Sequence, residues 1–166
     1  MPKKIKKPEV GPCERGYRIT AAAGLVASLL LAGWLIALIR LVDRTESKVF
    51  YISFFAVFAV YLIGSLMTFI MGIRAYRRED KTGPLIQGIS GLIGCAAGIY
   101  NLRTALLLLF TALGLDKQAD GLTGNRTYQE FIETQYSNWT LLLAAIALTG
   151  AAGVAACVKI AKAKRN

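Results

Sequence analysis

The chain has 166 residues, of which 55% are hydrophobic, and its mean hydropathy is +0.48. A soluble globule is excluded by this balance, because the apolar residues form blocks of about twenty or more, long enough to cross a bilayer as helices. The net charge is +10 and histidine is absent, which excludes histidine-ligated metals and histidine-based catalytic pairs.

The predicted fold class is therefore all-α, a polytopic membrane protein built as an antiparallel bundle of four transmembrane helices. Leucine, alanine and glycine dominate the apolar blocks without period-2 alternation, so helices are favoured over a membrane β-barrel. The four spans are predicted at about 19–42, 49–73, 84–112 and 139–158. Together they form one transmembrane domain over 19–158, which leaves no room for a separate soluble domain.

The distribution of charge predicts that both termini are cytoplasmic. With the amino terminus inside, 14 of the 20 lysine and arginine residues fall on the inner side. The inner segments then have a net charge of +10 and the outer segments a net charge of 0, as the positive-inside rule requires. We expect residues 1–18 and 159–166 to be basic cytoplasmic tails near anionic headgroups, the first without helical periodicity. Residues 113–138 form the larger outer loop.

Every predicted span carries small residues, most of them repeating at a spacing of four. Such stripes allow two helix backbones to approach closely inside a bilayer. The predicted packing residues are Gly24 and Ser28, then Gly64, Thr68 and Gly72, then Gly91, Gly94 and Gly98, and finally Thr149 and Gly153. Since all four spans share this pattern, we expect one compact bundle organised around the third span.

Two polar residues lie within the apolar run of the third span, and both are candidates for a functional site. Asn101 continues the glycine face, where it would form an interhelical hydrogen bond or line a polar path. Arg103 lies about 28 Å along the helix from Pro84, near the outer edge of a roughly 30 Å apolar layer. It would snorkel to headgroups, pair with Asp43 or Glu46, or bind a lipid or another anion.

The apolar sequence continues past Arg103 to Leu115, so this end of the third span is expected to project beyond the bilayer unless it tilts steeply. A projecting end needs cover from loop 116–137 or from another subunit, while Leu107 is expected to face lipid. Within the loop, turns are predicted at Gly121 and Gly124, and a short amphipathic helix over 127–135.

No catalytic site, metal site or cofactor is predicted, and we expect no enzymatic activity. Residues 88–91 read Gly-Ile-Ser-Gly, which is similar to the GxSG motif around the serine of rhomboid proteases. The resemblance covers these four residues alone, and the chain lacks the histidine and the six spans of that family. Ser90 is therefore expected to bond to a backbone carbonyl or to a neighbouring helix.

The predicted function is that of a small integral membrane protein acting by helix association, as a homo-oligomer or as an accessory subunit. The third span and the larger outer loop are the expected contact surfaces, and the plasma membrane is the expected location. The expected partners are the lipid bilayer, anionic lipid at the cytoplasmic face and another membrane protein, but not nucleic acid. The alternative is a small oligomeric channel or uncoupled transporter. Its polar path would be lined by Asn101 together with Tyr61, Ser65, Thr68, Gln87, Ser90 and Thr104.

Overall fold

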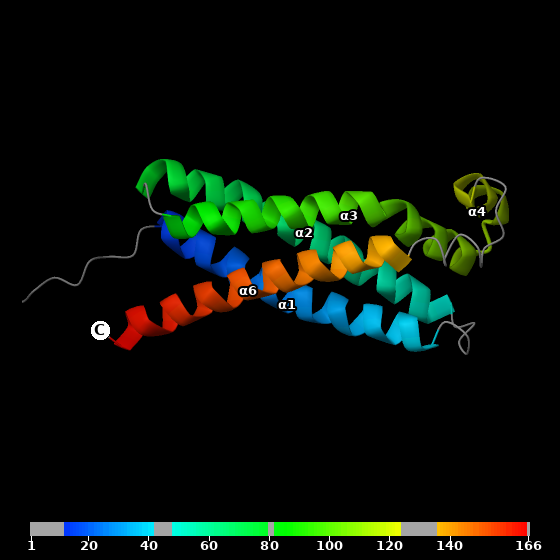
Figure 1. The fold of residues 1–166 in the computed structure, drawn as a ribbon, viewed down its shortest axis with the longest axis horizontal. Helices are drawn as coiled ribbons and strands as arrows, with labels where there is room; N and C mark the ends of the chain where they lie inside the picture. Colours follow the sequence, from blue (N-terminus) through cyan, green and yellow to red (C-terminus); the bar gives the residue numbers. More distant parts are fainter. Residues whose placement is uncertain (1–11, 42–47, 80–81, 124–135, 166) are drawn as a thin grey trace, which may run out of the picture.

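The computed structural model describes residues 12–41, 48–79, 82–123 and 136–165, and it is helical throughout these segments apart from a short turn (Figure 1). The helices are α1 (Pro12–Leu41), α2 (Lys48–Glu79), α3 (Thr82–Leu113), α4 (Asp116–Thr123) and α6 (Tyr136–Arg165). Four of them contain a stretch long and apolar enough to cross a membrane. These stretches are Arg18–Ala37, Lys48–Arg78, Gly83–Leu113 and Trp139–Lys159. The chain thus has the architecture of a multi-pass membrane protein.

The long helices extend beyond the predicted spans. α1 begins at Pro12, inside the segment expected to lack helical periodicity, and α2 continues to Glu79 through the charged residues after 73. Proline suits the first turn of a helix, where its missing N–H costs no hydrogen bond. A helix of 32 residues is about 48 Å long, which exceeds the roughly 30 Å hydrocarbon layer, so the polar ends of α2 reach beyond it.

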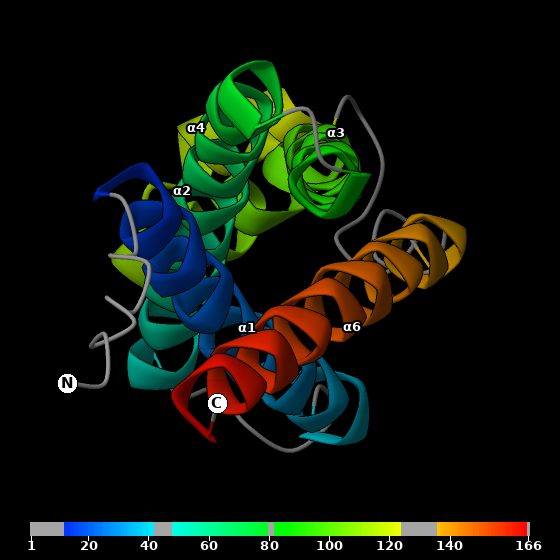
Figure 2. The ribbon, with the colours of Figure 1, turned by 90° about the vertical axis from the view of Figure 1, so that its left-hand side faces the viewer.

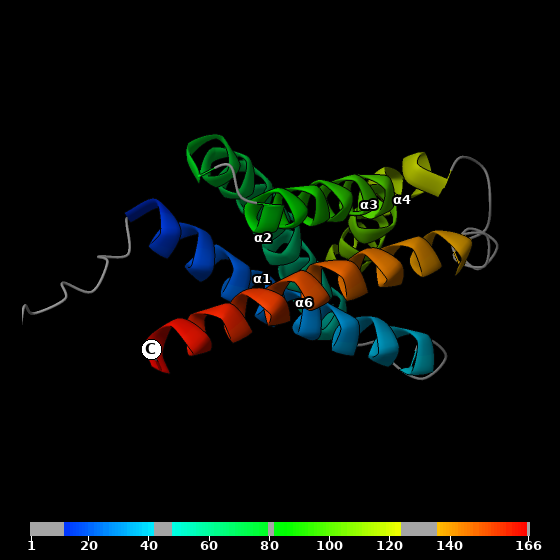
Figure 3. The same cartoon turned by 60° about the vertical axis from the view of Figure 1, so that its left-hand side comes forward.

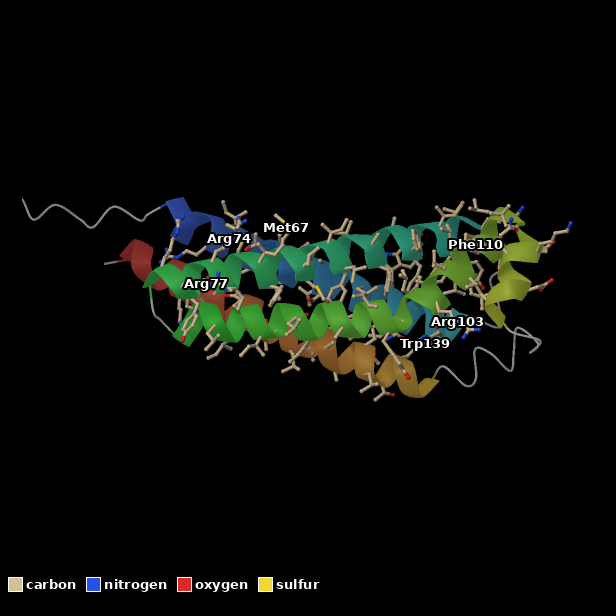
Figure 4. The ribbon with its side chains drawn as sticks, turned by 90° about the horizontal axis from the view of Figure 1, so that it is seen from above. Met67, Arg74, Arg77, Arg103, Phe110 and Trp139 are labelled. Atoms are coloured by element: carbon tan, nitrogen blue, oxygen red, sulfur yellow. The ribbon has the colours of Figure 1, made fainter. Side chains whose placement is uncertain are left out.

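The long helices are arranged in a ring. α1 contacts α2 and α6, while α3 contacts α2 and α6, as Figure 2 shows nearly end on. The starts of α1 and α3 lie at the same end of the molecule as the ends of α2 and α6 (Figure 1). We call this the basic end, because it carries Arg18, Arg74, Arg77, Arg78 and Lys159; Arg74 and Arg77 are labelled in Figure 4. The opposite end, which holds α4, is the α4 end.

The core differs between the two halves of the bundle. Large apolar side chains fill the half nearer α4, and each long helix contributes to them. The most completely buried of these apolar side chains are Leu31, Leu35, Phe58, Leu107, Leu108 and Leu142. The half nearer the basic end is packed instead through glycine, serine and threonine. Polar side chains therefore gather in this second half, where helix backbones come closest.

A tight turn joins α3 to α4. Gly114 has a φ of 71°, and the backbone N–H of Leu115 donates to the carbonyl of Phe110 at 2.9 Å. The N–H of Gly114 donates to the carbonyl of Thr111 at 3.2 Å. This pair of bonds is a Schellman motif, in which glycine takes the left-handed conformation without a Cβ clash. The turn reverses the chain, so α4 packs against the end of α3.

The expectation for Leu107 was wrong. Its side chain is fully buried, because the end of α3 packs against Phe54, Trp139 and the α4 residue Ala119 instead of projecting into lipid. Part of loop 116–137 thus provides cover, as α4. The turn expected at Gly121 is absent, since this glycine lies inside α4. Gly124 and the helix expected over 127–135 lie outside the described residues.

Candidate functional site

The backbones of α2 and α3 approach each other closely at two glycines. A Cβ added to Gly91 would lie 2.6 Å from the backbone nitrogen of Phe69 and 2.7 Å from the carbonyl oxygen of Ser65. A Cβ added to Gly72 would lie 2.6 Å from the backbone nitrogen of Gly88. Real Cβ atoms almost never come this close, and a backbone cannot move aside as a flexible side chain does. This contact therefore requires glycine at both positions.

Three other predicted packing glycines also lie close to a neighbouring helix. Gly94 and Gly98 of α3 face side chains of α2, and Gly153 of α6 faces α1. A Cβ on Gly94 would reach Ser65 Oγ at 2.6 Å, and one on Gly98 would reach Leu62 Cδ1 at 2.7 Å. Where α6 crosses α1 (Figure 3), a Cβ on Gly153 would lie 2.7 Å from the Cβ of Leu25. These positions bring α3 against α2, and α6 against α1.

Two glycines of the predicted stripes do not mark such close approaches. Gly24 has ordinary space, since an added Cβ would lie 3.5 Å from Thr68 Oγ1. A Cβ on Gly64 would meet nothing within 4 Å. The carbonyl of Gly64 accepts the hydroxyl of Thr68 at 2.8 Å, a hydrogen bond within α2.

Three helices are joined by hydroxyl groups that meet at Thr149 of α6. Thr149 Oγ1 lies 2.8 Å from Ser28 Oγ of α1 and 3.4 Å from the Tyr61 hydroxyl of α2. Ser28 also donates to the carbonyl of Gly24 at 2.8 Å. Thr149 and Ser28 were predicted only as small packing residues, so their joint hydrogen bond is a feature that stripe spacing could not reveal.

A small cavity that several polar residues line lies where the four long helices meet. Its lining consists of Ala21, Gly24, Tyr61, Ser65, Thr68, Gln87, Ser90 and Thr149. The space open to the centre of a water-sized sphere is about 10 Å³, which is close to what one water molecule needs. Most side chains of the predicted polar path therefore do meet, but around a space too small for a larger solute.

Asn101 and Thr104, the other members of the predicted path, do not line this cavity. Both are buried, and the amide nitrogen of Asn101 donates to the carbonyl of Ala97, one turn earlier in α3, at 2.8 Å. Asn101 is adjacent in sequence to Leu102, which packs against the apolar core. An interhelical hydrogen bond was one expectation for Asn101, whereas the bond from its amide nitrogen to Ala97 lies within α3.

Ser90 forms its hydrogen bond within its own helix. Its hydroxyl is buried and donates to the carbonyl of Gln87 at 2.8 Å, as expected for a serine inside a membrane helix. Among the described residues, no group of three or more histidine, cysteine or acidic side chains is placed to hold a metal ion.

Arg103 binds α4. Its side chain is exposed, and both Nε, at 2.7 Å, and a terminal nitrogen donate to the carbonyl of Leu122. Leu122 lies in the last turn of α4, where helix carbonyls have no partner within the helix and the helix dipole favours a cation. The expected partners Asp43 and Glu46 lie outside the described residues. Arg103 thus caps a short helix, an interaction that depends on the chain reversal at Gly114.

A second and larger space lies between α3 and α6 at the basic end. This crevice has about 80 Å³ open to the centre of a water-sized sphere. Its lining is Gly83, Ile86, Gln87, Ala152, Ala155, Ala156 and Lys159. Gln87 borders both spaces and is only 3% exposed, and its amide nitrogen donates to the carbonyl of Ala152 at 3.4 Å. Its side chain therefore separates the crevice from the inner cavity.

Comparison of the chain with protein-family models, with curated proteins and with solved structures found no match.

Proposed function

We propose that this chain is a non-enzymatic membrane protein, with both termini cytoplasmic, that acts by association through the outward face of α6. One observation carries this proposal. Four alanines face outward on α6, whereas the outward faces of α1, α2 and α3 each hold one among the described residues. The four are Ala144, Ala147, Ala151 and Ala155. Small side chains on a lipid-facing surface allow another helix to approach closely, which large side chains prevent.

This face is separate from the packing inside the bundle. The buried face of α6 holds Ala145, Thr149, Gly153 and Ala156, which lie on the opposite side of the helix. The outward sides of α1, α2 and α3 carry mainly leucine, isoleucine and valine, as suits contact with acyl chains. The third span was expected as a contact surface between subunits, but its glycines face α2 inside the bundle. We therefore assign association to α6 in place of α3.

The contact is tested by Ala151→Leu, with Ala96→Leu as its control. Both substitutions add the same side chain at an outward position, so neither should disturb the bundle itself. Leucine at a close helix contact typically costs about 1–3 kcal/mol, so Ala151→Leu should weaken self-association by about fivefold or more. Light scattering of the protein in detergent measures oligomer size over a concentration series.

Disulfide formation gives a second measurement. In a background without native cysteines, Ala151→Cys should cross-link between copies, and Ala96→Cys should not. If the wild type forms an oligomer whose size changes with neither leucine substitution, the proposed surface is wrong. The wild type could instead be monomeric and bind a second membrane protein. Loss of that binding in Ala151→Leu, but not in Ala96→Leu, would support the accessory-subunit form of the proposal.

The second candidate is a small channel or uncoupled transporter. It is favoured by Gln87, whose side chain separates the crevice at the basic end from the inner polar cavity. A conducting path must continue from there to the α4 end. In that half the core is made of large apolar side chains such as Leu31, Phe58 and Leu107, each at most 1% exposed. We rank this candidate second, because a water-filled path through that half would have to displace them.

A further inference from the structure

We infer that the crevice between α3 and α6 binds the headgroup of an anionic phospholipid. The inference goes beyond the proposed association, and it requires only that the helices lie in a bilayer. It rests on the size of the crevice, on the two polar side chains in its lining and on the charge of the end at which it opens.

The crevice is lined mainly by apolar residues, and its two polar side chains are those of Gln87 and Lys159. Ile86 is 62% exposed and Ala155 is also exposed, so the apolar part of the lining lies at the outer surface of the bundle. Lys159 is exposed near the carboxyl-terminal end of α6, and Gln87 is almost completely buried on the inner wall. An apolar surface leading to an ammonium group and an amide matches a phospholipid, whose chains continue from a phosphate.

The size of the crevice is compatible with a headgroup. Its open space of about 80 Å³ is several times what one water molecule needs. The backbone of Gly83 also lines it, in the first turn of α3, where helix N–H groups lack partners within the helix. A phosphate in this space would therefore meet N–H groups of α3 and the ammonium group of Lys159 on α6.

The charge of the basic end selects for an anion. The charged side chains that the structure describes at this end are all basic: Arg18, Arg74, Arg77, Arg78 and Lys159. At the α4 end, the described charged side chains include Asp116 and Asp120 beside Lys48, Arg103 and Lys117. Basic residues next to a membrane attract anionic lipids, so the crevice opens where such lipids would concentrate.

The inference is tested by titrating the full-length protein in detergent with dihexanoyl phosphatidylglycerol and dihexanoyl phosphatidylcholine, using calorimetry. The wild type should bind the anionic lipid more tightly. Lys159→Gln should weaken that binding by about fivefold, as expected for one basic residue at an anionic surface, whereas Lys159→Arg should retain most of it. Lys117→Gln, at the α4 end, is the control and should leave the affinity unchanged.

Two further measurements test where the lipid binds and whether its acyl chains contribute. Ala152→Leu narrows the crevice without changing any charge, and it should weaken binding of the anionic lipid as well. Glycerol phosphate, which lacks acyl chains, should bind more weakly than the lipid. Equal affinity for the two would identify a soluble phosphate compound as the ligand and overturn the lipid assignment. Lipid binding that is unaffected by Lys159→Gln and Ala152→Leu would also overturn it, whereas the association surface is tested separately by Ala151→Leu.

Discussion

Thr149 has more potential hydrogen-bond partners than its one hydroxyl proton can serve. It lies within bonding distance of Ser28, Tyr61 and the carbonyls of Ala145 and Ile146. One arrangement uses every proton of the three hydroxyls: Tyr61 donates to Thr149, Thr149 to Ser28, and Ser28 to a backbone carbonyl. Successive hydroxyl bonds polarise one another, so this order connects α2, α6 and α1 cooperatively.

At the same scale, Arg103 should act on α4 and not on the stability of the whole bundle. Replacing it with leucine removes a cation from the carbonyl end of α4, where such a charge is worth about 0.3–1 kcal/mol. Amide hydrogen exchange in α4 should then accelerate about two- to fivefold. Arg103→Lys should fall between leucine and wild type, because lysine keeps the charge but cannot place two N–H groups on one carbonyl as the guanidinium does.

Lys48→Leu is the control for this experiment, since it removes another exposed cation at the same end. Exchange in α4 should stay at the wild-type rate in this variant. If Arg103→Leu lowered the free energy of unfolding of the bundle while α4 exchanged normally, Arg103 would be a structural residue of the core and the capping role would be wrong.

At the scale of helix pairs, the α2–α3 contact makes Gly91 and Gly64 a matched pair. Gly91→Ala places a Cβ within 2.7 Å of two backbone atoms of α2, and the resulting overpacking should cost about 1–3 kcal/mol. Gly64→Ala makes the same chemical change in open space. It should leave stability unchanged or raise it by up to about 1 kcal/mol, because alanine favours helix more than glycine does.

Unfolding in mixed micelles, followed by circular dichroism, measures both free energies. Gly72→Ala should behave like Gly91→Ala, since it meets the backbone of Gly88. Equal losses for Gly64→Ala and Gly91→Ala would show that the two helices do not approach each other through their backbones as described.

At the scale of the whole molecule, the unequal charge of the two ends predicts its orientation. The basic end should be cytoplasmic and α4 should lie outside, because positively charged segments remain on the cytoplasmic side. In intact cells, a membrane-impermeant maleimide should label a variant whose only cysteine is Asp120→Cys in α4. It should not label a variant that keeps only the native Cys13 until the membrane is made permeable. Labelling of Cys13 in sealed cells would invert the proposed topology.

The sequence alone was enough to predict the four long apolar helices, because their existence depends on local properties. Length and hydropathy define a span wherever its neighbours lie. The small-residue stripes likewise indicated that the helices would pack closely. The helix ends differed from the predicted limits, because hydropathy marks only the apolar part of a helix. The backbone hydrogen bonds of α1 and α2 continue into the polar sequence beside it.

Only the tertiary structure decided which residues of those stripes are in close contact, and which polar groups meet. Gly64 and Gly91 have the same side chain and lie in similar stripes, yet just one faces a neighbouring backbone. Leu107 is buried, and Arg103 reaches Leu122, because α4 folds back after Gly114. These outcomes depend on the rotation of each helix about its axis and on its register against its neighbours. Both are set by the combined packing of all the helices, which no single span encodes.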